Sequence, residues 1–341
     1  MLTVTPEGLF CEAGRFYIDP WKSVEHALIT HAHSDHARGG SRNYLCATPG
    51  VGLLRSRLGH PERIQSIPYG ERRTIRGVQV SFHPAGHVLG SAQIRVEHQG
   101  EVWVVSGDYK LQSDPTCAPF ESIRCHTFVS ESTFGLPIYR WAEPQDVMEE
   151  INRWWRKNQE EKRTSVLFGY SLGKAQRLLA GVDPSLGPIF VHSAIRELLP
   201  LYADEGVVFP SVENATAEKI VAAQGRGLVL MPPGLDGGAW WDSLGEVSTG
   251  FASGWMLLRG TRRRRSGDRG FALSDHADWP GLLSAICATG ASRVWVTHGY
   301  TAPLVRWLGE NGWNAEVLPS RFEGDEPSMP AKSPPEDPVL S

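Results

Sequence analysis

The segment His31-Ala-His33-Ser-Asp35-His36 constrains the fold more than any other part of the chain. It places three imidazoles and a carboxylate close together, an arrangement that is unfavourable unless cations bind between them. Because the segment follows a β-type run and precedes Gly39-Gly40, we expect it on a loop leading into a turn or helix. His31 and His33 can face one ion, while Asp35 and His36 face a second. The alternative is a histidine-rich surface loop that binds no metal.

Three further candidate ligands lie in or after β-type runs. His87 in Pro84-Ala-Gly-His87 and Asp108 in Ser106-Gly-Asp108 occupy Gly-containing loops, and His298 follows an apolar run. A site for two ions needs a third histidine for the first ion and a carboxylate that bridges the pair. Each of these residues alone is compatible with an ordinary loop position. Their order along the chain, after the histidine-rich segment, predicts a metal centre.

The composition is that of a globular enzyme. With 341 residues and 41% hydrophobic residues, the chain is long enough for two compact domains. The net charge of −4 means that contacts with nucleic acid have to come from local basic patches. The five cysteines are widely spaced and form no CxxC pair, so we expect reduced thiols. We find no apolar run long enough to cross a membrane and no signal-like N-terminus, which predicts a cytoplasmic protein.

The order of the predicted elements indicates an inserted domain. Short β-type runs recur through the first third, and the first clear helix follows Pro144, with Val147, Ile151 and Trp154 on one face. From Val166 to about Leu258, β-type runs alternate with helices, as in a parallel α/β layer. Candidate ligands return only afterwards. We therefore expect a first domain in two parts at 1–140 and 257–322, an insertion at 141–256, and a disordered tail at 323–341.

The order HAHSDH, AGH, SGD resembles the ligand signature of metallo-β-lactamase-fold hydrolases, which have an αβ/βα sandwich fold. Asp19 matches the leading aspartate of that family, which orients a histidine and the loop without binding metal. Nitrogen and oxygen ligands without thiolate are compatible with zinc or manganese. The resemblance implies that the first ion is held by His31, His33 and His87, the second by Asp35, His36 and His298, and that Asp108 bridges them.

Glu131 in Ser130-Glu-Ser132, His276 in Ser274-Asp-His276 and His298 resemble motifs A, B and C of the β-CASP nucleases. In that group an α/β domain is inserted between motifs A and B, where we expect the insertion here. The resemblance covers the chain from about residue 10 to residue 320. It implies a two-metal hydrolysis of phosphodiesters in which His276 protonates the departing sugar oxygen and Glu131 orients His276 by a hydrogen bond. Asp108 would contribute to catalysis as the bridging carboxylate.

Two segments have the character of phosphate-binding elements. In Ser171-Leu-Gly-Lys174, the Ser171 hydroxyl, backbone N–H groups and Lys174 can bind a phosphate at the start of a predicted helix. The alternative is an ordinary capped helix. The run Arg262-Arg263-Arg264-Arg265 precedes motif B and predicts contacts with a nucleic-acid backbone. The alternative for this run is a solvated loop.

The block from Arg262 to Leu282 and the segment SLGKAQR are most similar to bacterial DNA exonucleases associated with a DNA ligase. This implies a metal-dependent 5′ to 3′ DNA exonuclease that acts in repair and has a functional link to a ligase. Phosphate binding by Lys174 and the run Arg262 to Arg265 further predicts a preference for ends with a 5′-phosphate. His298 is typical of RNA-processing members at motif C, so an RNA-processing ribonuclease is an alternative. A non-catalytic β-CASP scaffold subunit is expected to lose ligands, and a small ester or thioester hydrolase leaves the insertion and the arginine run unexplained.

Overall fold

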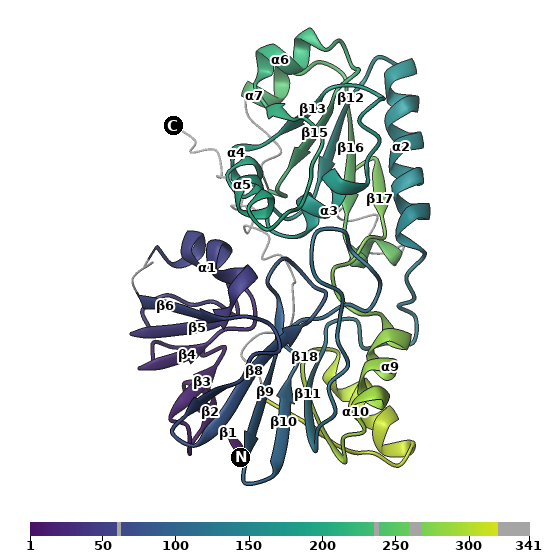
Figure 1. Cartoon of the computed structure of the whole chain (residues 1–341). Helices are drawn as coiled ribbons and strands as arrows, with labels where there is room; N and C mark the ends of the chain where they lie inside the picture. The colour runs from purple at the N-terminus through teal and green to yellow at the C-terminus, as the bar shows by residue number, and fades with distance from the viewer. Residues whose placement is uncertain (60–62, 235–238, 259–266, 320–341) are drawn as a thin grey trace, which may run out of the picture.

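Three β-sheets organise the computed structural model, which describes residues 1–59, 63–234, 239–258 and 267–319. The first two sheets face each other in the lobe that contains the N-terminus, and the third forms the other lobe (Figure 1). Side chains from both faces of the sandwich, including Phe16, Leu45, Phe82 and Trp103, make one core between the sheets.

The first sheet has the strand order β1 to β6 in sequence order. Its first three strands are antiparallel and the next three are added in parallel. Because side chains alternate between the two faces of a strand, Leu28 and Leu45 point into the sandwich, whereas Ala27 and Tyr44 pack under α1. The elements are β1 (Leu2–Thr5), β2 (Gly8–Cys11), β3 (Phe16–Ile18), β4 (His26–Leu28), β5 (Asn43–Ala47), η1 (Thr48–Gly50), α1 (Val51–Leu58) and β6 (Ile64–Ile67).

The second sheet has the order β19-β18-β11-β10-β9-β8-β7. Its strands from β7 to β10 pair antiparallel, and β10, β11, β18 and β19 pair parallel. Helices α9 and α10 cover its outer face, where Leu282 and Leu304 pack on Val104 and Val294. The elements are β7 (Arg73–Ile75), β8 (Val78–Pro84), β9 (Ala92–His98), β10 (Glu101–Val105), β11 (Thr127–Ser132), α9 (Trp279–Thr289), β18 (Arg293–Gly299), α10 (Thr301–Glu310) and β19 (Asn314–Val317).

These layers confirm the expected αβ/βα sandwich, and the third sheet is the expected α/β insertion. The third sheet is parallel throughout, in the order β14-β13-β15-β12-β16-β17. Its central strands β12, β13 and β15 are buried along their whole length because helices cover both faces. Its strands are β12 (Thr164–Phe168), β13 (Ile189–Val191), β14 (Glu213–Asn214), β15 (Leu228–Met231), β16 (Val247–Ala252) and β17 (Arg269–Phe271).

Helix α2 runs along one side of the inserted domain (Figure 1) and buries Val147, Ile151 and Trp154, as the sequence predicts. Helix α3 packs beside it through Leu178 and Leu179. The other face of the sheet is covered in part by α6. The helical elements are α2 (Pro144–Glu160), α3 (Lys174–Gly181), α4 (Ser193–Arg196), α5 (Leu199–Ala203), α6 (Ala217–Ala222), α7 (Ala239–Asp242) and η3 (Gly254–Leu257).

The inserted domain extends further than the sequence predicts. Strand β17 pairs in parallel with β16, with Phe271 opposite Ala252, so the third sheet continues beyond the expected boundary at 256. This three-residue strand is too short to show a periodic pattern of apolar residues, which explains why the sequence does not reveal it. The expected disordered tail at 323–341 lies outside the described residues.

All five cysteines are free, as expected of reduced thiols: Cys11, Cys46, Cys117, Cys125 and Cys287. Three of them are buried, and burial raises the pKa of the Cys46 thiol to about 12. Within the described ranges, every helix is too short or too polar to span a bilayer.

The loop between β8 and β9 is fixed by a close backbone contact with the first sheet's layer. Gly90 has a φ of 72°, and a Cβ atom there would lie 2.1 Å from Cα of Gly50, just before α1. The hydroxyl of Ser91 accepts hydrogen bonds from the N–H groups of His87, at 3.1 Å, and Val88, at 3.2 Å. The backbone that carries His87 is therefore tied to both sheets.

Replacing Gly90 with alanine tests this contact against a glycine of similar conformation. Gly100 has a φ of 82°, and a Cβ atom added there would have nothing within 4 Å. Gly100→Ala should therefore lower the free energy of unfolding by only about 1–2 kcal/mol, the cost of the left-handed backbone. Gly90→Ala should lower the free energy of unfolding by about 1–3 kcal/mol more, the usual effect of overpacking. Urea unfolding of both variants measures the difference, and equal losses would show that the loop shifts freely.

Candidate metal centre

The predicted ligands lie at the ends of strands that meet at one edge of the sandwich. Strands β10, β11 and β18 are adjacent and parallel, so their carboxyl ends lie together. Asp108 follows β10, Glu131 lies near the end of β11, and His298 lies near the end of β18. The segment from His31 to His36 follows β4 of the facing sheet, and His87 lies between β8 and β9. Loops from both sheets therefore converge on one place.

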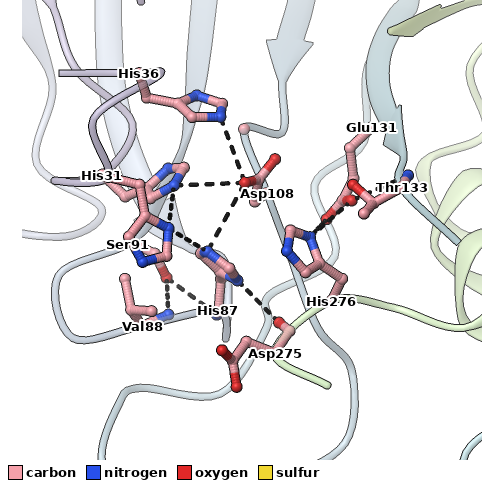
Figure 2. A network of polar contacts seen from close by, with 12 residues as sticks. His31, His36, His87, Val88, Ser91, Asp108, Glu131, Thr133, Asp275 and His276 are labelled. Carbon is pink, nitrogen blue, oxygen red and sulfur yellow. Dashed lines mark hydrogen bonds and ion pairs between the residues drawn. The ribbon is translucent and has the colours of Figure 1, made fainter. Parts of the chain in front are cut away.

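One group of donors consists of His31, His33, His87 and Asp108, whose ligand atoms all lie within 4.8 Å of one another. His33 Nδ1 lies 3.1 Å from His31 Nε2 and 3.0 Å from His87 Nε2. Asp108 Oδ2 lies 3.5 Å from His31 Nε2 and 3.8 Å from His87 Nε2. Figure 2 shows His31, His87 and His36 turned toward Asp108.

A second group contains Asp35, His36 and His298. His36 Nε2 lies 3.6 Å from Asp35 Oδ2, and the His36 and His298 rings are stacked with centroids 5.1 Å apart. Asp108 Oδ2 is 3.4 Å from His36 Nε2, about as close as it is to the first group. The structure thus brings all seven predicted ligands together and places Asp108 between the two groups.

Asp19 holds the loop that carries the histidine-rich segment. Its Oδ1 accepts a hydrogen bond from the Thr30 N–H at 2.8 Å, and its Oδ2 accepts from the Thr30 hydroxyl at 2.5 Å and from His36 Nδ1 at 2.8 Å. The Thr30 hydroxyl also lies 3.1 Å from His31 Nδ1. Asp19 therefore reaches His36 directly and His31 through Thr30, without belonging to either group of donors.

The two remaining histidines of the first group are held by backbone carbonyl groups. His87 Nδ1 donates to the Asp275 carbonyl at 2.9 Å, and His33 Nε2 donates to the Leu172 carbonyl at 3.2 Å. A carbonyl oxygen only accepts, so the opposite ring nitrogen of each histidine carries the lone pair. Leu172 belongs to the inserted domain, which therefore reaches the donors.

The donor atoms fit divalent cations. His36 Nε2 is buried without a hydrogen-bond partner in the described part of the structure, although it faces the carboxylates of Asp35 and Asp108. A buried nitrogen of this kind is unfavourable unless a ligand satisfies it. Imidazoles oriented by oxygen atoms on their far side, with carboxylates beside them, are the usual environment of zinc and related ions.

Burial and neighbouring charges together set the protonation of the site. Burial lowers the pKa of His31 well below its usual value and that of His87 to about 3, and neighbouring histidines add to both effects. Burial would also lower the pKa of His36, but Asp108 and Asp35 outweigh it and raise this pKa well above its usual value. For Asp108, burial acts to raise the pKa, and His36 overcomes it and lowers the value strongly. Neutral His31 and His87 beside an ionised Asp108 are the forms that bind metal.

His298 and Asp19 both adopt a left-handed backbone, with φ of 55° and 43°. For a residue with a Cβ atom this conformation costs about 1–2 kcal/mol. The strain at His298 is held by its neighbours, because the Ser132 hydroxyl donates to the His298 carbonyl, and β11 and β18 change register at this point. Strained residues that the surroundings hold in place are typical of functional sites.

His276 and Glu131 form a buried pair next to the metal ligands. His276 Nδ1 lies 2.9 Å from Glu131 Oε2 and 3.1 Å from Oε1 (Figure 2). The Tyr109 N–H donates to Glu131 Oε1 at 2.7 Å. His276 and Glu131 are 5% and 1% exposed. Their polar atoms lie within 4.8 Å of Asp108, so the pair stands beside the proposed bridging carboxylate.

The expected phosphate contact of Lys174 needs correction. Lys174 is 4% exposed, and its Nζ lies 2.7 Å from Asp275 Oδ2. Burial acts to raise the pKa of Asp275, but Lys174 and Arg177 lower it well below its usual value, so the pair is ionic. Helix α3 begins at Lys174 with Gly173 as its cap, and Ser171 lies on the half-buried loop before it. The Lys174 ammonium therefore forms a buried ion pair within the protein.

Sequence reasoning also missed Lys110, Asp114 and Arg177. Arg177 lies between the carboxylates of Asp114 and Asp275, and Lys110 donates to the Ser274 carbonyl. Lys110 lies two residues after Asp108, and this proximity to a candidate ligand was the only signal in the sequence. Burial lowers the pKa of Lys110 well below its usual value, and the nearby Arg177 lowers it further. The run from Arg262 to Arg265 lies outside the described residues.

No family model matches the chain. Among curated proteins, it is 30% identical over 314 residues to a protein of Opitutus terrae named "Probable DNA ligase", a match covering 91% of this chain and 30% of that protein. It is 26% identical to "Endoribonuclease YSH1" of Gibberella zeae over 67% of this chain and 28% of the relative. An "RNase J-like protein" of Methanocaldococcus jannaschii is 23% identical over 55% of this chain and 49% of the relative.

The chain thus spans less than half the length of each of these relatives. A solved structure of a protein of unknown function from Enterococcus faecalis superimposes with a TM-score of 0.61, covering 87% of this chain and 80% of that one. The two are 13% identical, so this likeness concerns the fold alone. The sandwich with its inserted domain, the ligand order and the similarity to these relatives are those of the β-CASP group of metallo-β-lactamase-fold nucleases, which the chain resembles along most of its length.

Proposed function

We propose that this protein is a metal-dependent nuclease that hydrolyses phosphodiester bonds in DNA as a 5′ to 3′ exonuclease acting in repair. The observation that carries the hydrolase part is the position of Asp108 Oδ2, 3.5 Å from His31 Nε2 and 3.4 Å from His36 Nε2. The same oxygen faces both groups of donors, which is what a bridging carboxylate requires. The five free cysteines support a reducing, cytoplasmic location.

The proposed cofactors are two divalent ions, zinc or manganese, since the donors are nitrogen and oxygen atoms without thiolate. His31, His33 and His87 would hold one ion, Asp35, His36 and His298 the other, and Asp108 both. Bound there, the ions would supply a water nucleophile at neutral pH and stabilise negative charge on the phosphate. Asp19 keeps His36 oriented through its 2.8 Å hydrogen bond.

His276 is the proposed general acid. Its Nδ1 is occupied by Glu131 at 2.9 Å, and the carboxylate favours the protonated imidazolium and fixes the ring orientation. The other ring nitrogen is then the one that can donate a proton to the departing sugar oxygen. Glu131 is itself held by the Tyr109 N–H at 2.7 Å, so the pair is pre-oriented before substrate arrives.

The DNA substrate is supported by the similarity of 91% of this chain to part of a protein named as a DNA ligase. A nuclease and a ligase act on the same strand ends, which supports a functional link and a preference for 5′-phosphate ends. The arginine run 262–265 and Ser171 are the proposed contacts to the DNA backbone. Lys174 is left out of this set because of its internal partner.

An RNA-processing ribonuclease is the second candidate function. The relatives named as an endoribonuclease and an RNase J-like protein favour it, as does histidine at position 298. Digestion of matched DNA and RNA strands, labelled separately at the 5′ and 3′ ends and supplemented with zinc or manganese, distinguishes the two. We expect the 5′ label to be released from DNA as a mononucleotide before the 3′-labelled strands become short. Cleavage of RNA with intact DNA would overturn the proposed substrate.

Metal analysis of two aspartate variants tests the proposed bridge. Asp108→Ala should lose both ions on desalting, because the carboxylate contacts both donor groups. Asp19→Ala should weaken metal affinity by only about 10- to 100-fold, the usual effect of removing a residue that orients a ligand. Full retention of both ions by Asp108→Ala would show that the bridge is wrongly assigned.

A third prediction concerns the general acid. His276→Ala should keep its metal but lose about 10²- to 10⁴-fold in the rate of DNA cleavage. The loss should shrink for bis(p-nitrophenyl) phosphate, whose leaving group needs no proton. His83→Ala is the matched control, since it removes a histidine 3.2 Å from Glu121, away from the donors. An equal loss on both substrates would exclude His276 as the acid.

A further inference from the structure

Helix α3 of the inserted domain extends two cations onto the loop that carries His276. Lys174 Nζ lies 2.7 Å from Asp275 Oδ2, and Arg177 Nη1 donates to the Ser274 carbonyl at 2.6 Å. Lys110, which follows β10 of the sandwich, donates to the same Ser274 carbonyl at 2.5 Å. Both domains therefore bind the same short segment, residues 274 and 275.

These ionisable groups are all removed from water. Lys110 and Arg177 are 2% exposed, Lys174 and Asp275 4%, and Asp114, which lies 3.5 Å from Arg177 Nε, 7%. Taking ionised groups out of water is costly, and a buried ion pair often adds little net stability over an apolar contact. The value of this arrangement therefore lies in the segment that it holds in place.

Residues 274 and 275, which these side chains hold, contact both parts of the proposed active site. The Asp275 carbonyl accepts the hydrogen bond of His87 Nδ1 at 2.9 Å, and the next residue is His276 (Figure 2). The His276 N–H donates to Ser274 Oγ at 3.1 Å. A displacement of residues 274 and 275 therefore turns a metal ligand and the proposed acid at once.

The start of α3 is packed directly against the loop of His87. Gly173 has a φ of 86°, and a Cβ atom there would lie 2.4 Å from Val88 Cγ1. One residue earlier, the Leu172 carbonyl accepts from His33 Nε2 at 3.2 Å. The inserted domain thus contacts the ligand loops at several points, and α3 cannot move without disturbing them.

We propose that Lys174 and Arg177 are positioning residues of the catalytic centre, which clamp residues 274 and 275 so that His87 and His276 face Asp108. The inserted domain, on this view, completes the site through the backbone of the motif B loop. The catalytic half of the inference rests on the proposed phosphodiester hydrolysis, whereas the metal-binding half does not. The competing explanation is that the buried charges only join the two domains.

Metal affinity tests the clamp without using activity. Lys174→Met removes the buried pair, and Lys219→Met is its control, because Lys219 Nζ also lies 2.7 Å from a carboxylate, that of Glu213, on the exposed surface of the same domain. In zinc titrations against a chelator, Lys174→Met should bind about 10- to 100-fold more weakly than wild type. Lys219→Met should match wild type, and Lys174→Arg, which retains a cation, should recover most of the affinity.

Measurements of activity then distinguish a positioning role of Lys174 from a role in joining the two domains. With Lys174→Met at saturating metal, kcat on DNA should fall about 10- to 100-fold while KM changes little. The loss should be smaller on bis(p-nitrophenyl) phosphate, as expected when proton donation is impaired. Equal losses on both substrates, tracking a lowered unfolding midpoint, would overturn the proposal, as would zinc affinity and kcat equal to those of Lys219→Met.

Arg177→Lys is the second variant, for use if Lys174→Met fails to fold. It keeps the positive charge but shortens the side chain that donates to the Ser274 carbonyl. Zinc affinity and kcat should therefore fall as in Lys174→Met, but by smaller factors. Wild-type affinity and kcat in Arg177→Lys would count against a role for Arg177. If the wild-type protein cleaves neither DNA nor RNA, the proposed function fails, while the zinc titrations still decide whether the clamp exists.

Discussion

The structure depends on one constraint. Imidazoles and carboxylates gathered in a buried site need hydrogen-bond partners on their outer side and cations on their inner side. Asp108 Oδ2 faces ring nitrogens of His31, His36 and His87 at 3.4–3.8 Å. Each of these rings is held on its far side by an oxygen atom, which leaves the inner nitrogens directed at a common space. Crowding of this kind is tolerated only where cations complete the arrangement. The sandwich, the loops and the inserted domain all serve to keep these groups in place.

The two domains contribute different parts of this arrangement. The sandwich supplies the candidate ligands, because three parallel strands end at one edge and the facing sheet brings the histidine-rich loop to the same edge. The inserted domain supplies contacts that orient them, through the Leu172 carbonyl and through Lys174 on α3. A site assembled in this way couples the relative position of the domains to the geometry of the ligands.

Much of the fold follows from local patterns in the sequence. Strands such as β8 and β9 alternate between the two faces, and α2 buries one face through Val147, Ile151 and Trp155, so both types of element are predictable. The insertion is also predictable, because an α/β pattern interrupts the series of ligands. Its end at β17 is not, since three residues carry no periodicity and join the sheet only through pairing with β16. The boundary is thus a property of strand pairing between distant segments.

The sequence by itself determined the chemistry of the site. Residue type and order name His31, His33, Asp35, His36, His87, Asp108 and His298, because donor atoms belong to side chains and the family signature keeps their order. Only the tertiary structure decided what surrounds them. Lys174 reads as a phosphate contact at a helix start, yet in the fold its ammonium is buried against Asp275, which is far away in the chain. Whether a lysine faces solvent or a carboxylate depends on which distant segment packs against it, and no local pattern contains that information.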